Sequence, residues 1–203
     1  TSLTKTNVTV NIDTTILDID AQVSIQSMGY EAFTNRKKFK DDTTKIREYY
    51  AKKVGDIQKT VVYGYDNLKI PYTIILKAKQ KTERVGNAIL VYPFLELPLS
   101  QNKLTQKERN YPVDFIFPWE DQFEFNLKLP GNFKVSKLLE PFNFDSDLVK
   151  ISIDYKYSDG LLTAKGTYKF KKATYSPEEY YKIKYYIDKI VKQFNEPILI
   201  EKI

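Results

Sequence analysis

The chain opens with hydrophobic and polar residues in alternation. Val8, Val10 and Ile12 fall on one side of an extended chain, and the alternation returns from Leu17 to Ile25 after a polar run at residues 13–15. A period of two is typical of strands that bury one face. We therefore expect two half-buried strands joined by a turn at that polar run.

The alternation stops between residues 30 and 53, where two short helices are expected instead. Three aromatic residues, Tyr30, Phe33 and Phe39, indicate the first helix. For the second, residues 41–44 offer an N-cap and Gly55 ends the helix. The side chains that we expect to face inward from the second helix are Ile46, Tyr49 and Tyr50.

Strands are expected again at residues 57–65, 71–78 and 88–92. The irregular stretch that follows, at 93–109, holds two prolines and is the best boundary between two lobes. We divide the chain there into 1–95, a β-rich lobe with an inserted helix pair, and 96–203. The stretch also carries four apolar residues that a free linker would lack, so we expect it to pack against the protein. They are Phe94, Leu95, Leu97 and Leu99.

The second lobe continues with short strands. Residues 113–117 and 123–129 alternate, with an expected turn at 118–121 between them. A long hairpin is expected where residues 149–157 and 162–170 flank a Ser-Asp-Gly turn. Short strands at this spacing are typical of a sandwich-like antiparallel unit.

The clearest helix lies near the end of the chain. Ser176, Pro177 and Glu179 form an S-x-x-E capping box with proline at the first helical position. Hydrophobic residues recur at three- and four-residue spacing as far as Phe194, which favours a helix packed on a sheet over a coiled-coil seam. A last short strand is expected at residues 198–200. The predicted fold class is therefore α+β, mainly β with antiparallel sheets and a sandwich-like C-terminal half that carries this helix.

The composition removes several kinds of chemistry. The 203 residues include no cysteine and no histidine, which excludes a Ser-His-Asp triad, a Cys-His pair, any disulfide and the usual structural zinc sites. The formal charge is +6, but only four of the 32 basic residues are arginines, and 26 acids lie among them. Such a balance is typical of a solvated surface, and we expect no nucleic-acid partner. No apolar run is long enough to cross a bilayer, so no membrane insertion is expected.

Few residue groups could carry chemistry. Asp18 and Asp20 share one face of an expected strand, and a glycosidase needs two carboxylates across a cleft. Adjacent acids on a solvent face are the more common explanation. Residues 145–147 lack the glycine and closing glutamate of an EF-hand, so a turn is expected there. We predict no catalytic residue, no cofactor and no metal site. The candidate ligand or interface aromatics are Tyr63, Tyr65 and Trp119, with a packed corner as the alternative for Trp119.

Several blocks of the sequence together resemble a known arrangement. The blocks are residues 17–36, 108–115 (ERNYPVDF), 127–135 (LKLPGNFKV), 175–180 (YSPEEY) and 193–202 (QFNEPILIEK). In this order they resemble the C-terminal region, a domain of unknown function, of bacterial proteins that carry a central transglutaminase-like domain after an N-terminal β domain.

This resemblance implies a role beside an enzyme. The Cys-His-Asp machinery of such proteins belongs to the central domain, and this chain has no cysteine or histidine to match it. The resemblance also implies that the chain is a separated part of such a protein, that its partners are the other domains of the same polypeptide, and that it is periplasmic or at the cell surface.

Three functional hypotheses follow from the sequence. The leading one is a noncatalytic accessory or structural module that packs on the transglutaminase-like domain or presents substrate to it. The alternative is a carbohydrate- or peptide-binding β-sandwich module that uses exposed aromatic residues. The third is a hydrolase that uses Asp18 and Asp20.

Overall fold

Strands from both halves of the chain join in common sheets. The computed structural model describes residues 2–13 and 18–203. In this part of the chain the helices are α1 (Tyr30–Phe39), α2 (Thr43–Val54) and α3 (Tyr180–Phe194), the last preceded by a 3-10 turn at Pro177–Glu179. The strands are β1 (Ser2–Ile12), β2 (Ile19–Met28), β3 (Asp56–Tyr63), β4 (Tyr72–Gln80), β5 (Glu83–Val85), β6 (Ala88–Val91), β7 (Val113–Asp114), β8 (Trp119–Lys128), β9 (Phe133–Lys137), β10 (Phe142–Asp145), β11 (Val149–Ser158), β12 (Leu161–Phe170), β13 (Thr174–Tyr175) and β14 (Ile198–Lys202).

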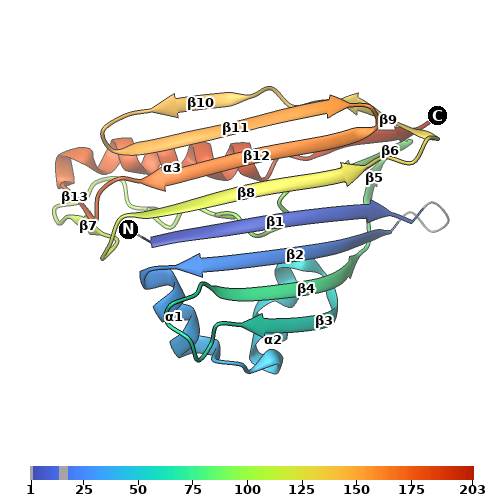
Figure 1. The fold of residues 1–203 in the computed structure, drawn as a ribbon. Coiled ribbons are helices and arrows are strands. Elements are labelled where there is room, and N and C mark those ends of the chain that lie inside the picture. Colours follow the sequence, from blue (N-terminus) through green and yellow to red (C-terminus); the bar gives the residue numbers. More distant parts are fainter. Residues whose placement is uncertain (1, 14–17) are drawn as a thin grey trace.

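The main sheet has the strand order β10-β11-β12-β8-β1-β2-β4-β3 (Figure 1). Its neighbouring strands are antiparallel except β1 and β8, which are parallel and lie at the middle of the sheet. A smaller sheet has the order β5-β6-β14-β9, so the C-terminal strand pairs with strands from both halves of the sequence. These sheets and the terminal helix confirm the predicted α+β class.

The register places the apolar positions of successive strands on one face of the main sheet. Val8 lies opposite Val23 on β2 and opposite Phe125 on β8, and all three side chains are buried. Their neighbours Asn7 and Glu124, on the other face, remain partly or largely exposed. The sheet therefore buries one face and leaves the other to solvent, as the period of two requires.

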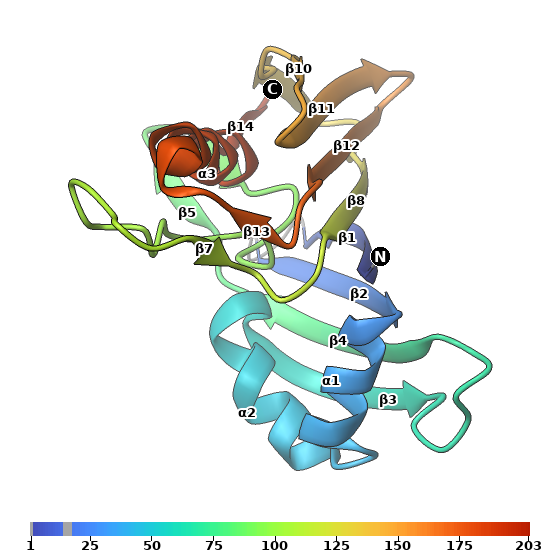
Figure 2. The same cartoon turned by 90° about the vertical axis from the view of Figure 1, so that its left-hand side faces the viewer.

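Two separate coverings, the helix pair α1 and α2 and the single helix α3, lie on the buried face of the main sheet. Figure 2 shows α1 and α2 beside β2, β4 and β3, and α3 on the same side of the sheet beside β8, β11 and β12. The seam of α3 was predicted correctly, because every apolar position in it is buried. These positions are Tyr180, Ile183, Ile187, Ile190 and Phe194.

The irregular stretch between β6 and β7 packs against the rest of the protein, as predicted. Phe94 and Leu95 are buried, and the amide of Asn195 donates to the carbonyl of Leu99 at 2.8 Å. The hydroxyl of Tyr180 donates to the carbonyl of Gln106 at 2.8 Å. The lobe boundary at residues 95 and 96 stays a prediction, and the pairings of β1 with β8 and of β6 with β14 cross it.

The predicted turn at residues 118–121 was wrong, because β8 already begins at Trp119. Trp119 pairs with Ser2 of β1 and with Phe170 of β12, and these two partners hold it in the sheet. The predicted strand before it was also too long, since β7 ends at Asp114 and the backbone takes a positive φ of 69° at Ile116.

Smaller differences concern individual residues. Tyr49 was expected to face inward but is 44% exposed, because only Ile46, Tyr50 and Val54 of α2 point into the core. The strands β5 and β10 were not predicted, and all three residues of β5 are exposed. The turn expected at residues 13–15 and the start of the second strand fall largely on residues 14–17, which lie outside the described residues.

The contact of β12 with α3 generates a stability prediction. A Cβ atom added at Gly166 would lie 2.5 Å from Cε1 of Phe194 and 3.2 Å from Cε2 of Phe94, both buried rings. We expect Gly166→Ala to lower the free energy of unfolding by about 1–3 kcal/mol, the usual cost of overpacking. Urea unfolding measures this, with Gly131→Ala as the control, since a Cβ there meets nothing within 4 Å. Equal stability of the two variants would contradict the packing described.

Candidate functional site

The buried face of the main sheet changes from apolar to polar toward the start of β1. Val8, Val10 and Ile12 occupy inward positions, and Thr4 and Thr6 continue the same series. Asp121 of β8 lies opposite Thr4 in the register and also faces inward. Hydroxyls and a carboxylate at inward positions interrupt the apolar core, because burying such groups is costly.

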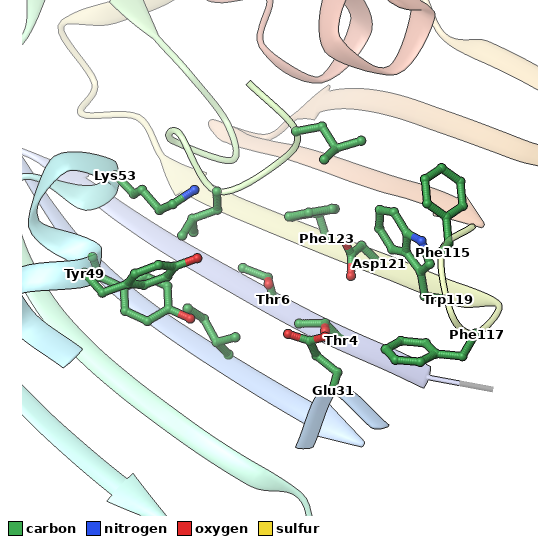
Figure 3. A pocket seen from close by; sticks show the side chains of 14 residues that line it. Thr4, Thr6, Glu31, Tyr49, Lys53, Phe115, Phe117, Trp119, Asp121 and Phe123 are labelled. Carbon is green, nitrogen blue, oxygen red and sulfur yellow. The ribbon is translucent and has the colours of Figure 1, made fainter. Parts of the chain in front are cut away.

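A cavity of about 400 Å³ lies over this polar stretch, and we call it the central pocket (Figure 3). Its floor comes from β1, β2 and β8, and its walls come from α1, α2 and the segment between β6 and β8. It therefore sits where the two coverings of the sheet meet. Its lining residues are Thr4, Thr6, Ile25, Glu31, Tyr49, Tyr50, Lys53, Leu97, Leu99, Phe115, Phe117, Trp119, Asp121 and Phe123.

Glu31 is held at the pocket by the way α1 begins. Gly29 has a φ of 64° at the N-cap position and offers no side chain to cap the helix. Ser2 of β1 takes over this role, because its Oγ accepts a hydrogen bond of 2.7 Å from the backbone N–H of Glu31. The first turn of α1 is thereby tied to the edge of the pocket floor.

Three aromatic residues of the pocket come from a tight backbone reversal. The N–H of Phe117 donates to the carbonyl of Phe115 at 2.7 Å, a γ-turn centred on Ile116. Ile116 has a positive φ of 69°, which strains its backbone, and its side chain is 81% exposed. Burial of this side chain therefore does not offset the strain. The strain is consistent with a requirement to present Phe115, Phe117 and then Trp119 to the pocket.

Other aromatic rings pack against the aromatic walls of the pocket. The ring of Phe117 stacks on Tyr30 with centroids 4.9 Å apart, and Trp119 stacks on Phe170 at 4.6 Å. Phe115 meets the Trp119 ring edge to face at 6.4 Å. These contacts fix the rings in place before any ligand arrives, which lowers the entropic cost of binding.

Asp121 has an unusual carboxylate. It accepts side-chain hydrogen bonds from Tyr168 and Thr4, which favour the ionised form, yet burial outweighs them and raises its pKa from 3.8 to about 7. The negative charge of Glu31 adds to this rise. The Tyr168 oxygen also accepts the backbone N–H of Leu99, so one network joins the pocket floor to the segment above it.

The charges of the pocket are separated. Burial raises the pKa of Glu31. Burial is also the main cause that raises the pKa of Tyr50, and the charges of Glu31 and Asp121 add to this rise, so these groups lie near one another. Burial lowers the pKa of Lys53, whose Nζ donates to the carbonyl of Glu96 at 3.3 Å. Figure 3 shows Lys53 and Tyr49 on one side, and Glu31, Phe117 and Trp119 on the other.

The sequence-predicted aromatic residues lie in different places. Trp119 lines the central pocket and is packed among other rings as well. Tyr63 ends the outermost strand β3 and is 54% exposed. Tyr65 lies in the following loop and lines a second hollow together with Leu68 and Arg36. The structure does not bring the three together.

The other candidates lie away from the central pocket. Asp20 is exposed on the outer face of β2, and Asp18 immediately precedes that strand. The turn predicted at residues 145–147 lies between β10, which ends at Asp145, and β11, which begins at Val149. In it the Ser146 N–H donates to the Val149 carbonyl at 3.0 Å. Among the described residues no group of three or more acidic side chains is placed to hold a metal ion.

Sequence reasoning missed both carboxylates of the pocket. The sequence predicts a turn at Asp121, and no motif around Glu31 indicates a functional residue. One signal was available: Ser2, Thr4 and Thr6 extend the inward series of β1 with hydroxyl residues. Hydroxyls at positions where a strand buries one face can indicate a polar cavity.

The comparisons with known proteins match part of the chain to one family. The family model is described as a domain of unknown function with a solved structure (DUF3858), and it matches residues 87–200, more than half of the chain. The domain-of-unknown-function part of the resemblance is thereby confirmed. No curated protein and no solved structure matched the chain. No helix of the described residues has the length and hydrophobicity that spanning a bilayer needs.

The raised pKa of Asp121 generates a prediction about stability and pH. Below about pH 4 the carboxyl is protonated in both the folded and the unfolded chain, and between pH 4 and 7 the unfolded chain ionises first. The folded state therefore loses stability over this interval, on the order of 2 kcal/mol once screening in an open pocket is allowed for. Asp121→Asn cannot ionise, so its stability relative to the wild type should rise from pH 4 to 7. Urea unfolding at several pH values measures the difference.

A second substitution checks the sign of this effect. The pKa of Asp145 is lowered by its hydrogen bond with Lys171, so Asp145→Asn should lose stability relative to the wild type as pH rises, and should do so at lower pH. A pH-independent difference between Asp121→Asn and the wild type would contradict the burial of the Asp121 carboxylate.

Proposed function

This chain belongs to the DUF3858 family, and we propose that it is a noncatalytic accessory module that binds a peptide segment in the central pocket. The observation that carries the proposal is the lining of this pocket: supported aromatic rings, two hydroxyls and charged groups of both signs surround about 400 Å³. Ligand pockets of proteins combine apolar walls with a few fixed polar groups in this way.

A peptide fits this lining better than a neutral sugar does. Thr4 and Thr6 can pair with backbone amides, and the rings of Phe117 and Trp119 can hold apolar or cationic side chains. The separated charges of Glu31 and Lys53 can pair with charged groups of a peptide, whereas a neutral oligosaccharide offers them only hydrogen bonds to its hydroxyls. Binding of glycans alone is therefore the competing result, and the experiment below includes it.

We further propose that the module serves a transglutaminase-like domain of the same polypeptide. The support is the resemblance of blocks at both ends of the chain and the absence of cysteine and histidine from its 203 residues. In this arrangement the chemistry lies in the neighbouring domain, and the central pocket holds a peptide segment near it. Bacterial origin and export to the periplasm or cell surface belong to the same proposal.

The single tryptophan of the chain gives a direct readout of pocket occupancy. Trp119 lines the central pocket, so a bound ligand should change its fluorescence. We expect at least some blocked tetrapeptides, from a set of cationic, anionic, apolar and aromatic composition, to change Trp119 emission saturably. Short glucan and N-acetylglucosamine oligosaccharides should not. Saturable binding of the sugars alone, or of neither set, would contradict the proposal, and cleavage of a bound peptide would contradict its noncatalytic part.

Two matched variants locate the binding. Phe117→Ala removes one wall of the pocket and should weaken peptide binding about tenfold, the loss typical of a central aromatic contact. Tyr63→Ala removes an aromatic of similar size from the sheet edge and should leave the affinity unchanged, since Tyr63 does not line the pocket. Equal losses in both variants would place the site elsewhere. Circular dichroism of each variant confirms that the fold is retained.

The link to an enzyme has its own test. The reading frame upstream of the codon for Thr1 should encode a transglutaminase-like domain with its Cys-His-Asp residues. That domain, prepared separately, should bind this chain in a pull-down at micromolar concentration. An upstream frame without such a domain would remove the enzymatic partner from the proposal and leave the peptide-binding part standing.

A further inference from the structure

Two carboxylates of the central pocket have no ion-pair partner among the described residues. Glu31 and Asp121 both line the pocket, and among the described residues neither forms an ion pair with a lysine or arginine. The hydrogen bonds that lower the pKa of Asp121 come from the neutral hydroxyls of Tyr168 and Thr4. Desolvated carboxylates without a counter-charge are costly, so this part of the pocket favours a positive group.

The nearest lysines of the chain are engaged elsewhere. The Nζ of Lys38 lies 3.3 Å from the centroid of the Tyr49 ring and 4.8 Å from that of Phe39. Burial raises the pKa of Glu31 more than the charge of Lys38 lowers it, and the two residues form no ion pair. Lys53 donates to the carbonyl of Glu96, and its pKa responds to Glu96 and Lys103 rather than to the two pocket carboxylates. Neither lysine therefore neutralises Glu31 or Asp121.

Aromatic faces lie at the same side of the pocket as these carboxylates. Figure 3 shows Phe117 beside Glu31, and Trp119 and Phe115 beside Asp121. Aromatic faces attract cations as well as apolar groups, most strongly for tryptophan. An aromatic wall next to two unneutralised carboxylates is the combination that proteins use to hold an ammonium group.

We propose that the central pocket selects a primary ammonium group, held between Glu31 and Asp121 against the rings of Phe117 and Trp119. The ammonium belongs to the side chain of a lysine in the bound segment, a choice that fits a pocket of about 400 Å³ whose lining also includes Thr4, Thr6 and Phe123 for the alkyl chain. This inference rests on the proposed peptide-binding function and names the residue that the pocket recognises.

Three blocked tripeptides test the charge while keeping the chain length. Each has the form acetyl-Gly-X-Gly-amide, where X is lysine, Nε-acetyl-lysine or norleucine. Trp119 fluorescence at pH 8 should show the lysine peptide binding at least tenfold more tightly than the other two, since acetylation removes the charge and norleucine removes the nitrogen. An N-terminally free Gly-norleucine-Gly-amide distinguishes a terminal ammonium from that of the lysine side chain.

Variants assign the preference to the two carboxylates. Glu31→Gln should reduce the preference for lysine over norleucine about tenfold, and so should Asp121→Asn. Glu124→Gln is the matched control: it lies on the outer face of the same strand, pairs with Lys165, and should leave the preference unchanged. If Asp121→Asn alters folding, the Glu31→Gln result decides, because the Glu31 carboxylate is hydrogen-bonded to no described residue.

The outcomes separate this inference from the proposed function. Binding of all three tripeptides with equal affinity would overturn the ammonium site and leave peptide binding intact. Tighter binding of the N-terminally free peptide than of the lysine peptide would overturn the assignment to a lysine side chain. If the lysine peptide produces no saturable change while other peptides of the earlier set bind, the ammonium site is again overturned. Failure of every peptide would overturn both proposals.

Discussion

The structure depends on one constraint: the main sheet must bury one whole face, and no single helix or helix pair covers that face. Period-two patterning puts the apolar side chains of β1, β2, β8 and β12 on the same side. The helices α1 and α2 cover one half of that side, and α3 covers the other (Figure 2). The coverings come from different parts of the sequence and meet over the parallel pair β1 and β8, where the central pocket lies.

Polar residues at that junction are consistent with a binding site. Without a binding function, their burial would only reduce the stability of the fold. Asp121 occupies a position at which an apolar residue would pack, and burial raises its pKa although Tyr168 and Thr4 donate hydrogen bonds to it. Ile116 adds backbone strain in the neighbouring turn. Proteins keep such locally unfavourable features where function requires them, and the two lie on either side of Trp119.

Local pattern was sufficient for most of the fold and insufficient for the site. The capping box at Ser176 and the seam of α3 are local signals, and the structure confirms both. Trp119, by contrast, follows a proline and precedes two acids, which reads locally as a turn. It is a strand residue because Ser2 and Phe170, more than fifty residues away along the chain on either side, pair with it. Glu31 likewise reaches the pocket through a cap that Ser2 provides from another element, and no short-range pattern encodes such a contact.

The residues of the central pocket come from both inside and outside the segment that the family model matches. The match to DUF3858 spans residues 87–200, so it includes Trp119 and Asp121 and excludes Glu31 and Lys53. The matched segment thus supplies the aromatic wall and the buried carboxylate, and the N-terminal segment supplies the second carboxylate and the lysine. Because β1 must pair with β8 for the floor to exist, the two segments can form the pocket only together. The family match therefore covers only part of the residues on which the proposed binding depends.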